Sequence, residues 1–207
     1  MKKLVFGMLM FFIATGSVWA GQCDDDPSYN YSRGHRSVYL NDVYDNSTAS
    51  NVRVCINNNV PSLWSNATNQ AILKLNNNLS SVDTILNYSS GSSNCDILIK
   101  YDNNFTDNKI AETKNILTSS SYIHINSNYS GSISDVKMKF TIMHELLHSV
   151  GLMHTGRNLY YEIPDTDNYW VTKYIPTSIM CAVNSSSYPS LEFNALDKLA
   201  IETLYPN

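Results

Sequence analysis

The chain has 207 residues, enough for one domain with a substantial core and too few for two large ones. Charged residues make up only 15%, and 25 Asn and 27 Ser supply uncharged polarity instead, which argues against a coiled coil and against a charge-rich disordered chain. With 14 Lys and Arg against 18 Asp and Glu, and no basic cluster, we expect no nucleic-acid partner.

Residues 1–20 have the three-part pattern of a secretory signal peptide. Two lysines precede an apolar run over 4–14, and the small residues that follow predict cleavage after Ala20. The run is shorter than the roughly 20 apolar residues that a membrane span needs, so we expect a secreted, or else periplasmic, protein without a membrane anchor. A lipoprotein anchored at Cys23 is the less favoured alternative, because Gln22 stands where such signals carry a small residue.

Four cysteines lie beyond the predicted signal peptide: Cys23, Cys55, Cys95 and Cys181. An even number in an oxidising compartment predicts two disulfides, for which three pairings are possible. Since none shows the Cys-x-x-Cys spacing of a zinc or redox site, all four are disulfide candidates. One disulfide together with a free thiol is the alternative that the residues leave open.

Residues 21–50 are polar and irregular and predict an extended leader, and no break in composition divides 51–207 into two domains. The alternation over 52–56 predicts a strand, and apolar residues at helical spacing predict a helix over 65–79. Three further segments have the composition of strands: 83–88, 95–101 and 121–127.

From Asp135 onwards the apolar residues recur with the period of a helix. Five of them form one stripe that we expect to face the core: Val136, Phe140, Met143, Leu147 and Val150. Gly151 follows the stripe, where a helix favours a C-terminal glycine. A last helix is predicted to begin after Asn194 as its N-cap and to end at Pro206.

The helix that ends at Gly151 carries a cluster of metal-binding side chains. His144 and His148 are four residues apart, so both rings project from one face and can bind a single Zn²⁺. Glu145 lies off the line between them and can reach a metal-bound water. Gly151 lets the chain turn without a Cβ clash, so that His154 can reach the same ion. Three protein ligands leave one position open, which is typical of catalytic rather than structural zinc.

Three of the five histidines of the chain lie in this cluster, and we favour a zinc site over histidines that are only packed in a core. His124, on the predicted strand 121–127, is expected to face solvent or a cleft and not to act as a fourth ligand. Two acidic segments, 24–26 and 102–107, could hold Ca²⁺, but they lack EF-hand spacing and are interpreted as solvated loops.

With these residues the chain resembles the metzincin metallopeptidases, whose long zinc motif it matches: His144-Glu145-x-x-His148-x-x-Gly151-x-x-His154. The segment 177–181 resembles the Met-turn of that family, in which Met180 would underlie the zinc site. Residues 193–205 resemble the closing helix of the family, and Asp197 matches an aspartate that hydrogen-bonds the Met-turn in the matrixin branch. The matching motifs cover about 144–206.

Within the family, the Leu-Tyr-Pro ending and the His154-Thr155 and Ser-Ile-Met sequences are most similar to the secreted bacterial HEIGH-type metallopeptidases. Two positions depart from the patterns of related branches. Ala182 stands where astacins and serralysins place a tyrosine that can bind zinc, so no such ligand is implied here. Leu146-Leu147 replaces the Ile-Gly of the HEIGH pattern.

The resemblance implies an α+β fold, a single metzincin domain with a twisted, mostly parallel sheet. Two helices would lie above the zinc cleft, and an irregular lower subdomain would end in the C-terminal helix. The resemblance further implies that strand 121–127 is the sheet edge that holds the substrate as an added antiparallel strand, and that loop 160–174 walls a specificity pocket.

The same resemblance implies a disulfide pairing, because it makes the strands of Cys55 and Cys95 neighbours in the sheet. Cys23 would then pair with Cys181 and tie the leader to the back of the Met-turn. In the alternative, Cys23 or the acidic residues 24–26 would occupy the zinc site as a latency device. The leader lacks the Pro-Arg-Cys-Gly-type motif of the matrixin switch, and the structural disulfide is favoured.

We therefore expect a secreted zinc endopeptidase that uses one catalytic Zn²⁺, with Glu145 as general base for a metal-activated water. Its partner would be a protein or peptide substrate bound as an extended strand, and the protein would act as a monomer. A zinc-binding recognition module that does not cut is one alternative, against which the intact Glu145 argues. A zinc amidase acting on cell-wall peptides is the other.

Overall fold

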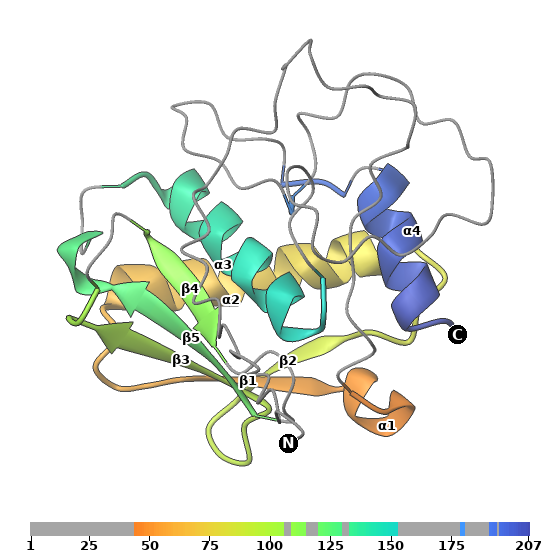
Figure 1. Cartoon of the computed structure of the whole chain (residues 1–207), viewed down its shortest axis with the longest axis horizontal. Coiled ribbons are helices and arrows are strands. Elements are labelled where there is room, and N and C mark those ends of the chain that lie inside the picture. Colours follow the sequence, from red (N-terminus) through yellow and green to blue (C-terminus); the bar gives the residue numbers. More distant parts are fainter. Residues whose placement is uncertain are drawn as a thin grey trace, which may run out of the picture.

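A five-stranded sheet with helices on one face forms the framework of the protein in a computed structural model of the chain (Figure 1). The structure describes residues 44–105, 109–114, 120–129, 133–152, 179–180, 191–193 and 195–207. Over these residues the protein is α+β with a mostly parallel sheet, which confirms that part of the expectation from sequence.

The sheet has the strand order β2-β1-β3-β5-β4. Its strands are β1 (Val52–Ile56), β2 (Tyr88–Gly91), β3 (Ile97–Asp102), β4 (Ala111–Lys114) and β5 (Ser121–Asn126). All neighbouring pairs are parallel except β4 and β5, which are antiparallel. Along β5, Ile123 and Ile125 are fully buried, whereas Tyr122 and His124, which alternate with them, are only partly buried, because successive side chains point to opposite faces of a sheet.

The expectation that strand 121–127 forms the edge of the sheet is wrong. β5 lies between β3 and β4, and the edge strand on this side of the sheet is β4, a strand that the sequence did not predict. Its residues, Ala-Glu-Thr-Lys, contain one small apolar side chain and show no alternation of apolar and polar residues. Strand β4 forms because its backbone pairs with β5, with Ala111 opposite Ile125 and Thr113 opposite Ile123.

The predicted strand over 83–88 is also displaced, since β2 begins only at Tyr88. The residues before it pair instead with the end of the chain. Thr84 forms an antiparallel bridge with Pro206, and the amide of Ile85 donates to the carbonyl oxygen of Tyr205 at 3.1 Å. These backbone contacts hold the last residues of the chain against this segment, which therefore does not extend the sheet.

The helices are α1 (Asn46–Ala49), α2 (Ser62–Leu79), α3 (Asp135–Ser149) and α4 (Ala195–Leu204), with a 3₁₀ turn over Ser127–Tyr129. Helices α2 and α3 lie along one face of the sheet, and α4 lies beyond the C-terminal end of α2 (Figure 1). Side-chain caps begin two of these helices, because Asp45 accepts from the amide of Thr48 and Ser134 from that of Lys137. None of the helices in the described ranges is long and apolar enough to span a membrane.

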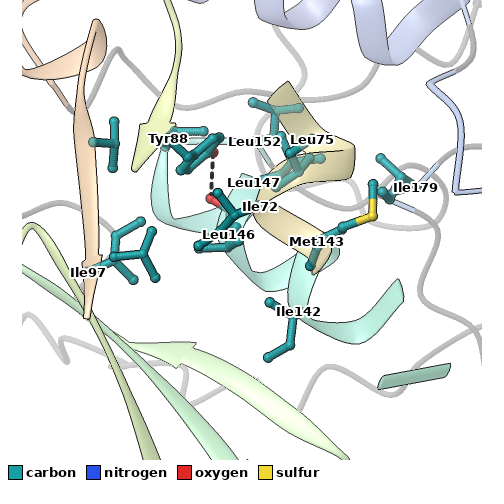
Figure 2. Packing of buried hydrophobic residues seen from close by; sticks show 14 of the residues in the cluster. Ile72, Leu75, Tyr88, Ile97, Ile142, Met143, Leu146, Leu147, Leu152 and Ile179 are labelled. Atoms are coloured by element: carbon teal, nitrogen blue, oxygen red, sulfur yellow. Dashed lines mark hydrogen bonds between the residues drawn. The ribbon is translucent and has the colours of Figure 1, made fainter. Parts of the chain in front are cut away.

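Packing between α2, α3 and the sheet forms the core (Figure 2). Leu146 and Leu147 of α3 lie among Ile72 and Leu75 of α2 and Ile97 of β3. Four residues of the predicted stripe are buried as expected: Phe140, Met143, Leu147 and Val150. The fifth, Val136 in the first turn of α3, is 51% exposed, so that prediction is wrong.

The second half of α3 is buried on all sides. Every residue from Phe140 to Ser149 is buried, including the polar and ionisable ones, so this part of the helix is a central element and not an amphipathic surface helix. Two residues from the predicted leader also belong to the core, because Tyr44 and Ala49 are buried in the same cluster.

Cys55 at the end of β1 and Cys95 just before β3 form a disulfide, with their Cα atoms 5.6 Å apart. This confirms one of the two expected pairings. Cys23 and Cys181 lie outside the described residues, so a bridge between them stays a prediction.

Candidate metal centre

The rings of His144 and His148 meet inside the protein. Their Nε2 atoms are 3.1 Å apart, and the two rings are nearly perpendicular, with centroids 4.6 Å apart. Both side chains are more than nine-tenths buried. The four-residue spacing on α3 therefore brings two imidazole nitrogens to one point, as the sequence predicted.

Backbone carbonyl groups hold the other nitrogen of each ring. Nδ1 of His144 lies 2.7 Å from the carbonyl oxygen of Ile179, and Nδ1 of His148 lies 2.7 Å from that of Leu152. A carbonyl oxygen only accepts, so each Nδ1 is the protonated donor, and an imidazole protonated at Nδ1 alone offers the lone pair of Nε2 to a cation. The two Nε2 atoms, 3.1 Å apart, are thus close enough for one cation to bind both.

The end of α3 explains why the Leu152 carbonyl lies beside His148. Gly151 has a φ of 101°, a conformation that residues with a Cβ rarely adopt. The amide of Gly151 donates to the His148 carbonyl at 3.0 Å, and that of Leu152 donates to the Leu147 carbonyl at 3.1 Å. These two bonds form a Schellman motif, which turns the chain back so that the next carbonyl oxygen faces the ring of His148.

Ile179 is held from both sides of its backbone. Its carbonyl oxygen accepts from His144, and its amide donates to Oδ2 of Asp197 at 3.1 Å. Met180 and Asp197 are both fully buried. Asp197 stands in the first turn of α4, where a carboxylate also interacts favourably with the helix dipole. The contact expected between Asp197 and the turn at Met180 is therefore present, and it connects α4 to His144 through the backbone of one residue, Ile179.

Glu145, between the two histidines in sequence, is a buried carboxyl group with one described partner. The hydroxyl Oγ1 of Thr113 on β4 lies 2.6 Å from Oε2 of Glu145 and 2.9 Å from its backbone carbonyl oxygen. Burial raises the pKa of Glu145, and the nearby His144 and the hydrogen bond from Thr113 act in the opposite direction. Sequence reasoning missed Thr113, because nothing in the Ala-Glu-Thr-Lys segment marks it as a neighbour of a residue 32 positions away.

The structure brings together two of the three predicted ligands. His154, the third, lies outside the described residues, as does the predicted wall loop over 160–174. Within the part of the chain that the structure describes, no group of three His, Cys, Asp or Glu side chains is placed to hold a metal ion. The described residues themselves thus supply a histidine pair and an adjacent carboxyl group.

His124, which we did not expect to act as a ligand, lies on the other face of the sheet. It alternates with the buried Ile123 and Ile125 and so points away from α3. Its Nδ1 is 2.7 Å from Oδ2 of Asp102 on the neighbouring strand, and this hydrogen bond is the main cause that lowers the pKa of Asp102. Asp102, which the sequence included in a possible Ca²⁺ loop, is therefore engaged by a histidine and by the amide of Asn104.

No model of a known protein family matches the chain, and no curated protein sequence matches it. The described residues offer a buried pair of imidazole nitrogens, a buried carboxyl group next to them, and a hydroxyl bound to that carboxyl group. All of these groups lie on one helix and one edge strand.

Proposed function

We propose that the protein is a secreted zinc endopeptidase of the metzincin type. The observation that carries the proposal is the pair of Nε2 atoms 3.1 Å apart, with the carboxyl group of Glu145 buried beside them. The zinc motif around them and the predicted signal peptide add support from sequence. The proposal places the active protein outside the cell membrane, as a monomer.

The distance between the two histidine nitrogens fits a shared zinc ion. Imidazole nitrogens bind zinc at about 2.0–2.1 Å in a tetrahedral arrangement, so two such ligands lie about 3.3 Å apart. The separation of 3.1 Å between the Nε2 atoms is close to this value. A zinc-binding histidine also usually donates its other ring proton to a carbonyl or carboxylate group, and both rings do so here. His154 would be the third ligand by the motif.

The proposed reaction is hydrolysis of a peptide bond. Bound zinc would supply Lewis-acid chemistry, lowering the pKa of a water molecule and polarising a carbonyl group. Glu145 acts as general base by taking a proton from the water, and then as general acid by giving it to the leaving amine.

An extended peptide substrate can be placed on β4. Among the described residues this strand pairs only with β5, which leaves the hydrogen-bonding groups of its other edge for a further strand. Thr113 of the same strand reaches Glu145, so a peptide on this edge would run close to the proposed general base. The substrate is thus placed on β4 instead of strand 121–127, and the expected mode of binding, as an added strand, is kept.

The test is cleavage of casein and gelatin by the secreted, zinc-loaded protein, with Glu145→Gln as the inactive variant. Glu112→Gln is the matched control, because Glu112 is also a carboxylate close to Thr113 but pairs with Lys114 at 2.7 Å. We expect cleavage by wild type and by Glu112→Gln, and none by Glu145→Gln. Wild-type cleavage no faster than that of Glu145→Gln would contradict the proposal.

A second arm with purified peptidoglycan separates the alternatives. Release of cell-wall peptides without cleavage of casein would favour the zinc amidase. Zinc binding without hydrolysis of either material would favour the recognition module.

A further inference from the structure

The Thr113 hydroxyl group makes two contacts with a single residue. It lies 2.6 Å from Oε2 of Glu145 and 2.9 Å from the carbonyl oxygen of the same residue. Thr113 lies opposite Ile123 in the β4–β5 ladder, and Ile123 is fully buried. The side chain of Thr113 therefore points to the inner face of the sheet, where α3 lies.

This contact gives Glu145 a defined orientation. A glutamate side chain rotates about three bonds, so its carboxylate takes one position only if neighbouring groups hold it. Among the described residues, Thr113 supplies the hydrogen bonds to that carboxylate, with its hydroxyl group 2.6 Å from Oε2 and its backbone amide as a second donor. Since the hydroxyl group engages Oε2, we assign the exchange of a proton with a water molecule to the other oxygen, Oε1.

We infer that Thr113 is a positioning residue for the general base, an inference that rests on the proposed peptidase function. It acts through Glu145 by holding Oε2, so that Oε1 keeps the geometry that proton transfer needs. Thr113 also belongs to β4, the strand on which we place the substrate. The same strand therefore carries the substrate and orients the base.

A purely structural role makes a different prediction. If Thr113 only holds α3 against β4, loss of its hydroxyl group would lower stability and leave the catalytic constant of the folded protein unchanged. Thr113→Val removes the hydroxyl group and keeps the shape and the strand preference of the side chain. Thr113→Ser keeps the hydroxyl group and removes only a methyl group.

Steady-state kinetics of the zinc-loaded full protein, on one peptide taken from its casein digest, separates these roles. We expect Thr113→Val to lower kcat about 10- to 100-fold, the usual cost of losing a group that orients an active-site residue, with KM changed less than twofold. Thr113→Ser should keep most of the wild-type kcat. The matched control is Thr84→Val, because the Thr84 hydroxyl also donates to a carbonyl oxygen, that of Tyr205, at 2.7 Å, and not to Glu145. The kcat of this variant should equal that of wild type.

Wild-type kcat in Thr113→Val, or equal loss in Thr113→Ser and Thr113→Val, would overturn the inference. A crystal structure of zinc-loaded Thr113→Val gives a readout that does not need activity. The inference predicts a displaced Glu145 carboxylate or several conformers of it, and an unmoved single conformer would overturn it. If wild type cleaves no peptide, the proposed function fails, and the position of the carboxylate still decides the role of Thr113.

Discussion

Glu145 is an ionisable group placed where charge is unfavourable. Burial raises its pKa above the ordinary value of 4.5, and Thr113 supplies its described hydrogen bonds. Such a residue usually costs stability and is found where function needs it. The histidine rings beside it each contact a backbone carbonyl oxygen, so hydrogen bonds hold all three side chains of the site in place.

In protein stripped of metal by a chelator, Glu145→Gln should therefore be more stable than wild type at neutral pH. A carboxyl group whose pKa is higher in the folded than in the unfolded state binds its proton more tightly in the folded state. Wild type therefore loses stability as the pH rises from about 4.5 to the pKa of Glu145 in the folded state. Glutamine does not titrate, so the difference in unfolding free energy between Glu145→Gln and wild type should grow over that pH range to about 0.5–2 kcal/mol. Urea unfolding at a series of pH values measures it. Equal pH dependence of the two proteins would contradict the expected pKa shift.

At the scale of elements, the ends of α3 and α4 build the site. The Schellman motif after α3 supplies the carbonyl oxygen that binds His148, and the first turn of α4 supplies the carboxylate that binds the turn at Ile179. Each histidine is thus oriented by a different element. Changes in either element should alter metal affinity without touching a ligand.

Gly151→Ala should weaken both the fold and the site. The φ of 101° at this position costs a residue with a Cβ about 1–2 kcal/mol, and relief of the strain would move the Leu152 carbonyl away from His148. We expect an unfolding free energy lower by about that amount and a zinc affinity reduced about 10-fold. Gly91→Ala is the control, because an added Cβ there meets the nearest atom, Sγ of Cys55, at an ordinary 3.4 Å. Unchanged zinc affinity in Gly151→Ala would show that the Leu152 carbonyl does not orient His148.

Asp197→Ala should destabilise the protein by about 1–3 kcal/mol, because it leaves the buried amide of Ile179 without its acceptor. Asp197→Asn, which keeps an oxygen in the same place, should lose less. Thermal unfolding of the three proteins tests this expectation. An unchanged melting temperature in Asp197→Ala would mean that the carboxylate does not support the turn.

The elements also show how much of the structure could be predicted from the sequence alone. Helix α3, its terminal glycine and its histidine pair were predictable, because periodicity and residue type are local signals. Strand β4 was not, since its four residues form a strand only through pairing with β5. The contact between Thr113 and Glu145 depends on that strand and joins residues 32 positions apart, so no local pattern could indicate it. The exposure of Val136 likewise depends on what lies opposite the first turn of α3 and not on the spacing of its apolar residues.

At the scale of the whole molecule, the described protein is a sheet covered on one face by two helices and tied together by distant contacts. The Cys55–Cys95 disulfide links β1 to the segment that leads into β3. The last residues of the chain pair with those after α2, where the Tyr205 carbonyl accepts from Thr84 and Ile85. The Tyr205 hydroxyl donates to the carbonyl of Val150 at 3.0 Å, so the C-terminus also supports the end of the histidine helix.

Replacing both Cys55 and Cys95 by serine should lower the free energy of unfolding by about 2–4 kcal/mol, because the bridge closes a loop of 40 residues in the unfolded chain. Urea unfolding of the oxidised protein and the double variant measures the loss. Peptide mapping without reduction gives the complementary test, and should recover Cys55 joined to Cys95 and Cys23 joined to Cys181. A free thiol at Cys23, with activity that rises when residues before Ser50 are clipped, would instead support the latency role.

The central claim is that His144 and His148 hold a catalytic zinc ion beside Glu145. Its most direct test is the zinc content of purified, zinc-reconstituted wild type, His148→Ala and Glu145→Gln, measured by elemental analysis against protein concentration. The account predicts one zinc per chain in wild type and in Glu145→Gln, because the carboxylate is not a ligand, and loss of zinc in His148→Ala. Absence of any transition metal from wild type, or full zinc content in His148→Ala, would contradict it.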